Sequence, residues 1–182
     1  MSSRRTPSVA ITLSLSLSLF VGVAVSPSCV GSAQPTADDL RLTVPLRAGF
    51  EGVADAMQPS CGTLDCHGQV TRNLRLFGGR GLRLSGADTS ADGITTPAEY
   101  EATYWGVVAL EPETIASVVQ DGGNSPERLL LMRKGRGTTR HKGGSLMHPQ
   151  DDLDTCLVEW LRGKLAVDRC QAAAQMGDNP TP

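Results

Sequence analysis

Two cysteines and a histidine lie close together in the segment Cys61-Gly62-Thr63-Leu64-Asp65-Cys66-His67. The spacing constrains the fold, because one short loop must present both thiols and the imidazole. Two cysteines followed directly by a histidine form the motif that attaches a haem covalently, through two thioether bonds and an axial bond from the imidazole to iron. That motif usually has two residues between the cysteines, whereas four separate Cys61 from Cys66. We therefore predict haem c as a cofactor, bound by Cys61, Cys66 and the proximal ligand His67 on a loop that bulges.

The N-terminal segment has the pattern of an export signal. Arg4 and Arg5 precede an apolar run at residues 9–25, which small residues follow. Two processing sites compete: cleavage after Ala33, and cleavage before Cys29, which would then carry a lipid and tether the chain to a membrane. The first fits better, because Cys29 has no leucine three residues before it. We expect an exported protein of the periplasm or cell envelope, lipid-anchored if Cys29 is the processing site.

The domain organisation follows from length and polarity. The 149 residues that remain without a leader are enough for one core and too few for two domains. We predict a signal peptide at residues 1–33, a polar linker at 34–45, one folded domain at 46–176 and a disordered tail at 177–182.

Apolar periodicity predicts a mostly α fold with irregular loops. Thr96-Pro97-Ala98-Glu99 is a capping box with proline at the first helical position. The glycine-rich alternation at 73–85 predicts a short β-hairpin, and residues 135–149 predict an irregular loop. The expected helices span residues 46–57, 96–109, 112–120, 126–134, 151–162 and 167–176.

The cysteines leave two alternatives open. An exported protein meets an oxidising compartment, in which thiols form disulfides. If Cys61 and Cys66 form thioethers, Cys156 and Cys170 remain to form one disulfide. If instead Cys61 pairs with Cys66, the chain is a haem-free, disulfide-stapled envelope protein that binds or scaffolds. Two other chemistries fit less well: zinc binding requires free thiolates, and a thiol oxidoreductase requires two residues between its cysteines.

Charge excludes one broad class of partner. The chain has a formal charge of −2, which becomes more negative when Arg4 and Arg5 leave with the leader, so nucleic-acid binding is not expected. One local basic cluster stands out, without an intervening acid: Arg128, Arg133, Lys134, Arg136, Arg140 and Lys142. The cluster is either a solvated run or a surface for haem propionates or an acidic redox partner.

The order of several short motifs resembles small exported bacterial c-type cytochrome domains over residues 46–163. The segments that carry the resemblance are Cys66-His67-Gly68, Gly81-Leu82-Arg83-Leu84, Pro126-Glu127-Arg128-Leu129-Leu130, His141-Lys142-Gly143-Gly144 and Val158-Glu159-Trp160-Leu161. The resemblance implies a small helical domain that carries electrons to and from redox partner proteins and is not an enzyme. It also implies that His141, on its glycine-flanked loop, is the distal iron ligand.

Other residues compete with His141 for the distal position. Met147 is the second choice, because histidine with methionine is another common axial pair. Met132 has the pattern of helix core, and His148 that of a solvated loop histidine.

Overall fold

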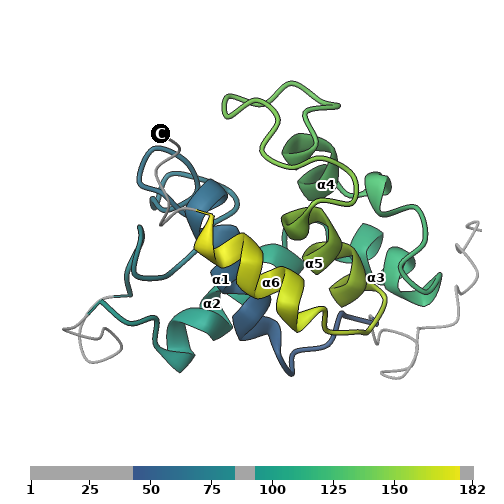
Figure 1. Ribbon diagram of the computed structural model, residues 1–182, viewed down its shortest axis with the longest axis horizontal. Helices are drawn as coiled ribbons and strands as arrows, with labels where there is room; N and C mark the ends of the chain where they lie inside the picture. Colours follow the sequence, from purple (N-terminus) through teal and green to yellow (C-terminus); the bar gives the residue numbers. More distant parts are fainter. Residues whose placement is uncertain (1–42, 85–92, 177–182) are drawn as a thin grey trace, which may run out of the picture. The chain divides into compact units, whose positions relative to one another are not determined.

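The computed structural model describes residues 43–84 and 93–176 (Figure 1). Outside these ranges lie the predicted leader, the predicted tail and residues 34–42 of the predicted linker. The mostly α prediction is confirmed, and the part described contains no β-strand. Its elements are α1 (Phe50–Cys61), α2 (Pro97–Val108), α3 (Pro112–Gln120), the 3₁₀ helix η2 (Pro126–Arg128), α4 (Leu130–Gly135), α5 (Asp152–Leu161) and α6 (Val167–Gln175).

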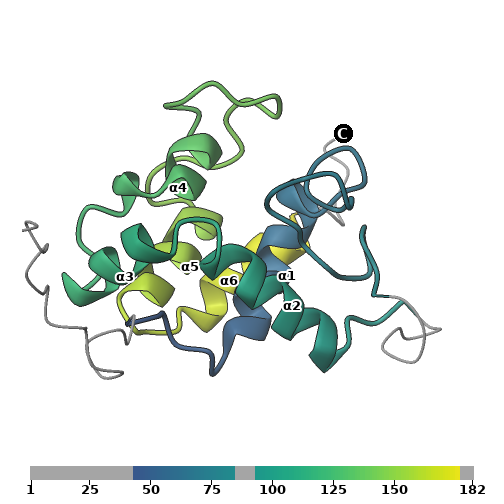
Figure 2. The same ribbon diagram turned by 180° about the vertical axis from the view of Figure 1, so that it is seen from behind.

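Helices α1, α5 and α6 pack against one another, as both views of the ribbon show (Figure 2). An aromatic cluster joins them to α2. The Phe50 ring lies edge-on to Tyr104, with 5.2 Å between ring centres, and 5.1 Å from the ring of Trp160. Edge contacts of this kind add to the free energy gained from burial.

The same aromatic residues fix the segment that precedes α1. The Tyr104 hydroxyl donates to the carbonyl of Pro45 at 2.7 Å, and the Trp160 indole donates to the carbonyl of Leu46 at 2.7 Å. Val44 packs against the core. Residues 44 and 45, predicted as linker, therefore belong to the packed part of the chain.

Helix α1 differs from its prediction at both ends. It begins at Phe50 instead of residue 46, because Gly49 adopts a left-handed conformation with φ of 76°. The predicted end at residue 57 is wrong, since α1 continues through Pro59 to Cys61. Proline removes one hydrogen bond of the ladder, but the backbone N–H of Gly62 donates to the carbonyls of Met57 and Gln58 and closes the last turn. Cys61 is thus part of the helix and not of a loop.

The predicted capping box at the start of α2 is confirmed, and it carries a buried carboxylate. The Thr96 side chain accepts from the backbone of Glu99, whose own side chain accepts from the backbone of Thr96. Glu99 is fully buried and pairs with Arg83 at 2.7 Å. Burial alone would raise the pKa of Glu99, but hydrogen bonds from Arg83 and from the backbones of Thr96 and Leu84 hold it below its usual value. The pair therefore ties the segment before residue 85 to α2.

Two predicted elements take a different form. The glycine-rich segment makes a tight turn with one isolated bridge between Phe77 and Leu82 instead of a hairpin. The helix predicted at 126–134 is split at Leu129, whose backbone is extended between η2 and α4. Glu111 accepts the backbone N–H of Leu130 and so satisfies a donor at the start of α4.

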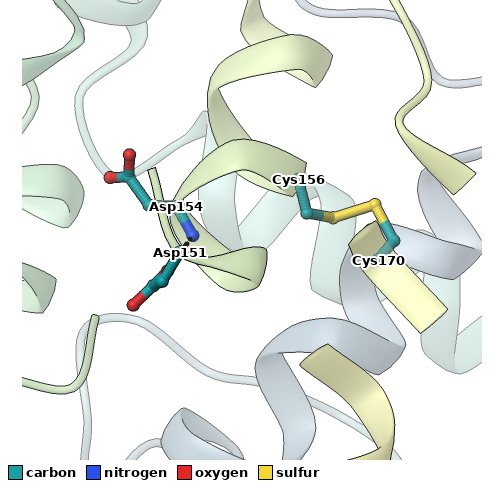
Figure 3. Close-up of a disulfide and its surroundings, with 4 residues drawn as sticks. All are labelled: Asp151, Asp154, Cys156 and Cys170. Atoms are coloured by element: carbon teal, nitrogen blue, oxygen red, sulfur yellow. Dashed lines mark hydrogen bonds between the residues drawn. A yellow bond between two sulfur atoms is a disulfide. The ribbon is translucent and has the colours of Figure 1, made fainter. Parts of the chain in front are cut away.

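The predicted disulfide between Cys156 and Cys170 is present and joins α5 to α6 (Figure 3). Five residues before Cys156, the Asp151 carboxylate caps α5 by accepting the backbone N–H of Asp154 at 2.8 Å. Cys61 and Cys66 are free thiols. No helix in the described ranges has both the length and the hydropathy needed to cross a bilayer.

Replacing both Cys156 and Cys170 with alanine should lower the free energy of unfolding by about 3 kcal/mol, the chain-entropy value for a loop of this size. Denaturant unfolding checks the value. Parent protein unfolded under reducing conditions should match the double variant. A double variant as stable as the oxidised parent would show that the disulfide adds nothing.

Candidate functional site

A cavity of about 520 Å³ separates the cysteine-histidine loop from α4 and the loop that follows it. This volume is typical of sites for small organic molecules, roughly 300–1,000 Å³. Cys61, Cys66 and His67 line one side, and His141 lines the other. The structure thus brings all four of these predicted site residues to a single cavity.

The loop between the two cysteines closes on itself. The backbone N–H of His67 donates to the carbonyl of Cys61 at 2.8 Å. The carbonyl of Thr63 accepts from the backbones of Cys66 and Gly68, both at 2.9 Å. These bonds accommodate the two extra residues of the motif as a compact turn, and both sulfur-bearing residues still border the cavity.

Two glycines allow this turn to pack tightly against the neighbouring backbone. A Cβ atom on Gly68 would lie 2.1 Å from the carbonyl oxygen of Gly62, and one on Gly81 would lie 2.0 Å from the same oxygen. Real side chains do not approach a backbone atom so closely. The glycine after His67 and the one at position 81 are therefore steric requirements of the site.

The side chain of His67 is oriented by the backbone. Its Nδ1 lies 3.1 Å from the carbonyl of Leu74, a contact that fits an imidazole protonated at Nδ1. Burial lowers the pKa of His67, the hydrogen bond to the carbonyl of Leu74 opposes that shift, and the neighbouring His141, Arg72 and Lys134 lower the pKa further. The net shift favours the neutral ring, in which Nε2 is available as an electron-pair donor.

His141 faces His67 across the cavity. The ring centres are 6.1 Å apart and the ring planes differ by 17°. Nδ1 of His141 lies 3.4 Å from the carbonyl of Gly144. Within residues 43–84 and 93–176, neither Nε2 atom has a hydrogen-bond partner.

The two rings are stacked, with nearly parallel planes and 6.1 Å between their centres. The Nδ1 contacts match the way in which metal-bound histidines engage backbone carbonyls.

The loop that carries His141 is fixed at its base. The carbonyl of Gly135 accepts from the backbones of Leu146 and Met147, at 2.8 and 3.1 Å. The Met147 side chain packs beside Gly135 in the core and does not line the cavity. Met132 is likewise buried in the core, and His148 is exposed. Of the four candidates for a distal ligand, the structure brings only His141 to the cavity.

The cavity has an apolar wall and a positively charged rim. Its apolar lining consists of Leu74, Leu110, Leu130, Leu131 and Leu146. The charged side chains that line it are Arg72, Lys134, Arg140, Lys142 and Asp65. None of these four cations forms an ion pair within the part of the chain described, whereas Arg128 and Arg136 of the predicted basic cluster pair with Asp121 and Asp154. Three residues of the predicted basic cluster that form no ion pair in the described ranges, Lys134, Arg140 and Lys142, therefore lie with Arg72 around the cavity of the two histidines.

Sequence reasoning missed the part played by Arg72. Its guanidinium donates to the carbonyls of Cys66 and Asp65, at 3.1 and 3.3 Å, and so supports the motif loop from the rim. A single arginine on a polar loop has no periodic or motif signal that would have identified it.

The thiol of Cys61 is a weak nucleophile. Desolvation at the end of α1, with a smaller effect from Cys66, raises the pKa of Cys61 to about 12. The thiol is therefore protonated at neutral pH.

No group of three or more His, Cys, Asp or Glu side chains in the described ranges is placed to hold a metal ion. A structural zinc site requires about four such ligands. A porphyrin carries its own four nitrogens and requires only axial ligands from the protein. No protein-family model matches the chain, and searches of curated proteins and of solved structures give no match.

Replacing Gly68 with alanine should destabilise the fold by roughly 1–3 kcal/mol, because the new Cβ meets the backbone of Gly62. The matched control is Gly52→Ala in α1, where a Cβ makes only an ordinary 3.8 Å contact with Cys170. That variant should be more stable than the parent by roughly 0.5–1 kcal/mol. Thermal or denaturant unfolding measures both, and equal stabilities would contradict the steric account.

Proposed function

We propose that the chain binds one haem c covalently in the cell envelope and carries electrons between redox proteins. The observation that carries the proposal is the facing pair His67 and His141, 6.1 Å apart, across a cavity that both cysteines of the motif border. Two thiols, two imidazoles and an apolar wall form the set of groups that a haem requires.

Each part of the cavity has a role in this proposal. The bound haem supplies a one-electron iron couple. Cys61 and Cys66 would hold the macrocycle through thioethers, and His67 and His141 would bind the iron. Contact with the carbonyl of Leu74 sets the orientation of His67 and makes its free nitrogen more basic.

The wall and rim of the cavity set the polarity and the charge around the proposed haem. The five leucines exclude water from the macrocycle and lower the local dielectric constant. Arg72, Lys134, Arg140 and Lys142 offset the negative charge of the two propionates. Two histidine ligands favour a lower reduction potential than histidine with methionine would.

The haem-free alternative has less support. Its second disulfide would join Cys61 to Cys66, which are free thiols. It also gives no role to two opposed imidazoles or to the unpaired cations around them.

Covalent attachment can be tested directly. The full chain, produced in a host that matures c-type cytochromes, should retain haem after denaturation and give a haemochrome spectrum. Replacing either Cys61 or Cys66 with alanine should leave one thioether and shift the α band. Replacing both Cys156 and Cys170 should leave the attachment intact. A mass equal to that of the bare processed polypeptide would contradict the proposal.

The distal ligand can be tested with a matched pair of histidines. His141→Ala should remove the low-spin optical spectrum without releasing the haem, whereas His148→Ala, at an exposed position, should leave the spectrum unchanged. An unchanged spectrum in His141→Ala, with a change in Met147→Leu, would assign the distal position to Met147.

A further inference from the structure

The loop that carries His141 leaves α4 and borders the cavity before the chain turns towards α5 (Figure 1). We call residues 137–145 of this loop the histidine strap. Seven of these nine residues are exposed, and the other two, Thr139 and His141, are half-buried. The strap residues that line the cavity are Arg140, His141, Lys142 and Gly143.

The hydrogen bonds of the strap all lie at its base or within it. The backbone N–H groups of residues 137–139 donate to carbonyls of α4. The Ser145 hydroxyl donates to the carbonyls of Arg136 and Met147, at 3.4 and 3.3 Å. In the part of the chain that the structure describes, no strap residue forms a hydrogen bond beyond residues 133–147. The strap is therefore held along one side only.

One ring contact joins the strap to the opposite side of the cavity. The ring of His141 stacks on that of His67, with 6.1 Å between the ring centres. A single stacked pair contributes little free energy. Segments with few buried contacts open locally without unfolding of the whole domain. The stacked pair is thus a weak latch.

Glycines in left-handed conformations mark both ends of the strap. Gly137 and Gly144 each have a φ of 70°. A Cβ atom on Gly144 would have nothing within 4 Å, so the backbone conformation alone favours glycine there. Hinges are a few loop residues that absorb large changes in backbone angles. These two glycines allow the strap to swing on its base.

Like charges meet where the strap closes over the cavity. Arg140 and Lys142 of the strap line the cavity together with Arg72 and Lys134, and Asp65 is the one carboxylate among the lining side chains. None of the four cations has an ion-pair partner in the described ranges. Their mutual repulsion opposes closure, and an anionic ligand would remove that opposition.

We propose that the histidine strap is the entry gate of the cavity. It swings on Gly137 and Gly144 to admit a planar apolar ligand, and it closes when anionic groups of that ligand engage Arg140 and Lys142. The leucines of the cavity wall contact the apolar body of the ligand. Carboxylates form strong charge-assisted hydrogen bonds with such cations. A porphyrin with two carboxylates belongs to this class, and the inference rests on the proposed function for that choice alone.

Metal-free protoporphyrin IX is the probe, because it has the apolar ring and the carboxylates of haem but no iron for a histidine to bind. Its fluorescence is followed after rapid mixing with the full chain, produced without haem. The binding rate should rise with porphyrin concentration and then reach a plateau, which is the rate at which the strap opens. A rate that stays linear in concentration would mean that the cavity is always open, and would overturn the proposal.

Two glycine variants with the same backbone strain test the hinge. Gly144→Ala and Gly163→Ala each place alanine at a φ of 70° or 75°, and neither new Cβ has an atom within 4 Å. Gly144→Ala should raise the plateau rate by roughly fivefold, because opening relieves the strain of the left-handed conformation. Gly163→Ala, between α5 and α6, should leave the plateau unchanged. Equal plateaus in the two variants would contradict the hinge.

A pair of histidine variants tests the latch. His141→Ala removes the ring that stacks on His67 and should raise the plateau rate by roughly threefold. His148→Ala, at an exposed position outside the strap, should not change it. An unchanged plateau in His141→Ala would show that the stacked pair does not hold the strap closed.

Charge variants test which ligand closes the gate. Arg140→Gln with Lys142→Gln should raise the dissociation rate of protoporphyrin IX by roughly threefold, because its carboxylates lose two cationic partners. Arg162→Gln with Arg169→Gln removes the same charge from residues that do not line the cavity, and should have no effect. Equal dissociation rates in the two double variants would exclude a role for the strap cations.

The gate and the proposed function can fail separately. Covalent haem in the matured chain, together with a linear porphyrin rate or no porphyrin uptake, would overturn the gate and leave the proposed function in place. A plateau that Gly144→Ala raises, in a chain that never retains haem after denaturation, would support the gate and overturn covalent attachment.

Discussion

The site depends on one close approach of backbones. Gly68 and Gly81 both lie against the carbonyl oxygen of Gly62, at distances that leave no room for a side chain on either. Their meeting joins the end of α1, the residue after His67 and the turn before Arg83 into one rigid unit. Since protein interiors transmit small displacements, the positions of both cysteines and of His67 follow from this contact.

Much of the fold could be predicted from local signals. The capping box at Thr96 and the acids at the start of α5 act through neighbouring residues, so the sequence alone identifies these helix starts. The end of α1 could not be predicted in this way. Local rules place a break at Pro59, but bonds from Gly62 back to residues 57 and 58 keep the last turn helical.

The site shows the same division between local and long-range information. Cys61, Cys66 and His67 are adjacent in the chain, and their spacing alone identified them as a group. The placement of His141 opposite His67 depends on how α4 and its following loop pack, which no local pattern encodes. Arg72 could not be identified from the sequence, because its hydrogen-bond partners are backbone carbonyls. The Met147 side chain packs in the core beside Gly135, at the base of the loop that carries His141.

The high pKa of the Cys61 thiol has a consequence for maturation. Disulfide exchange proceeds through a thiolate, and the raised pKa of Cys61 leaves its thiol almost entirely protonated at pH 7. In the folded chain Cys61 is therefore a slow nucleophile towards oxidants and towards the bonded pair Cys156 and Cys170. Desolvation at the end of α1 thus slows the reaction of the first cysteine of the motif with oxidants.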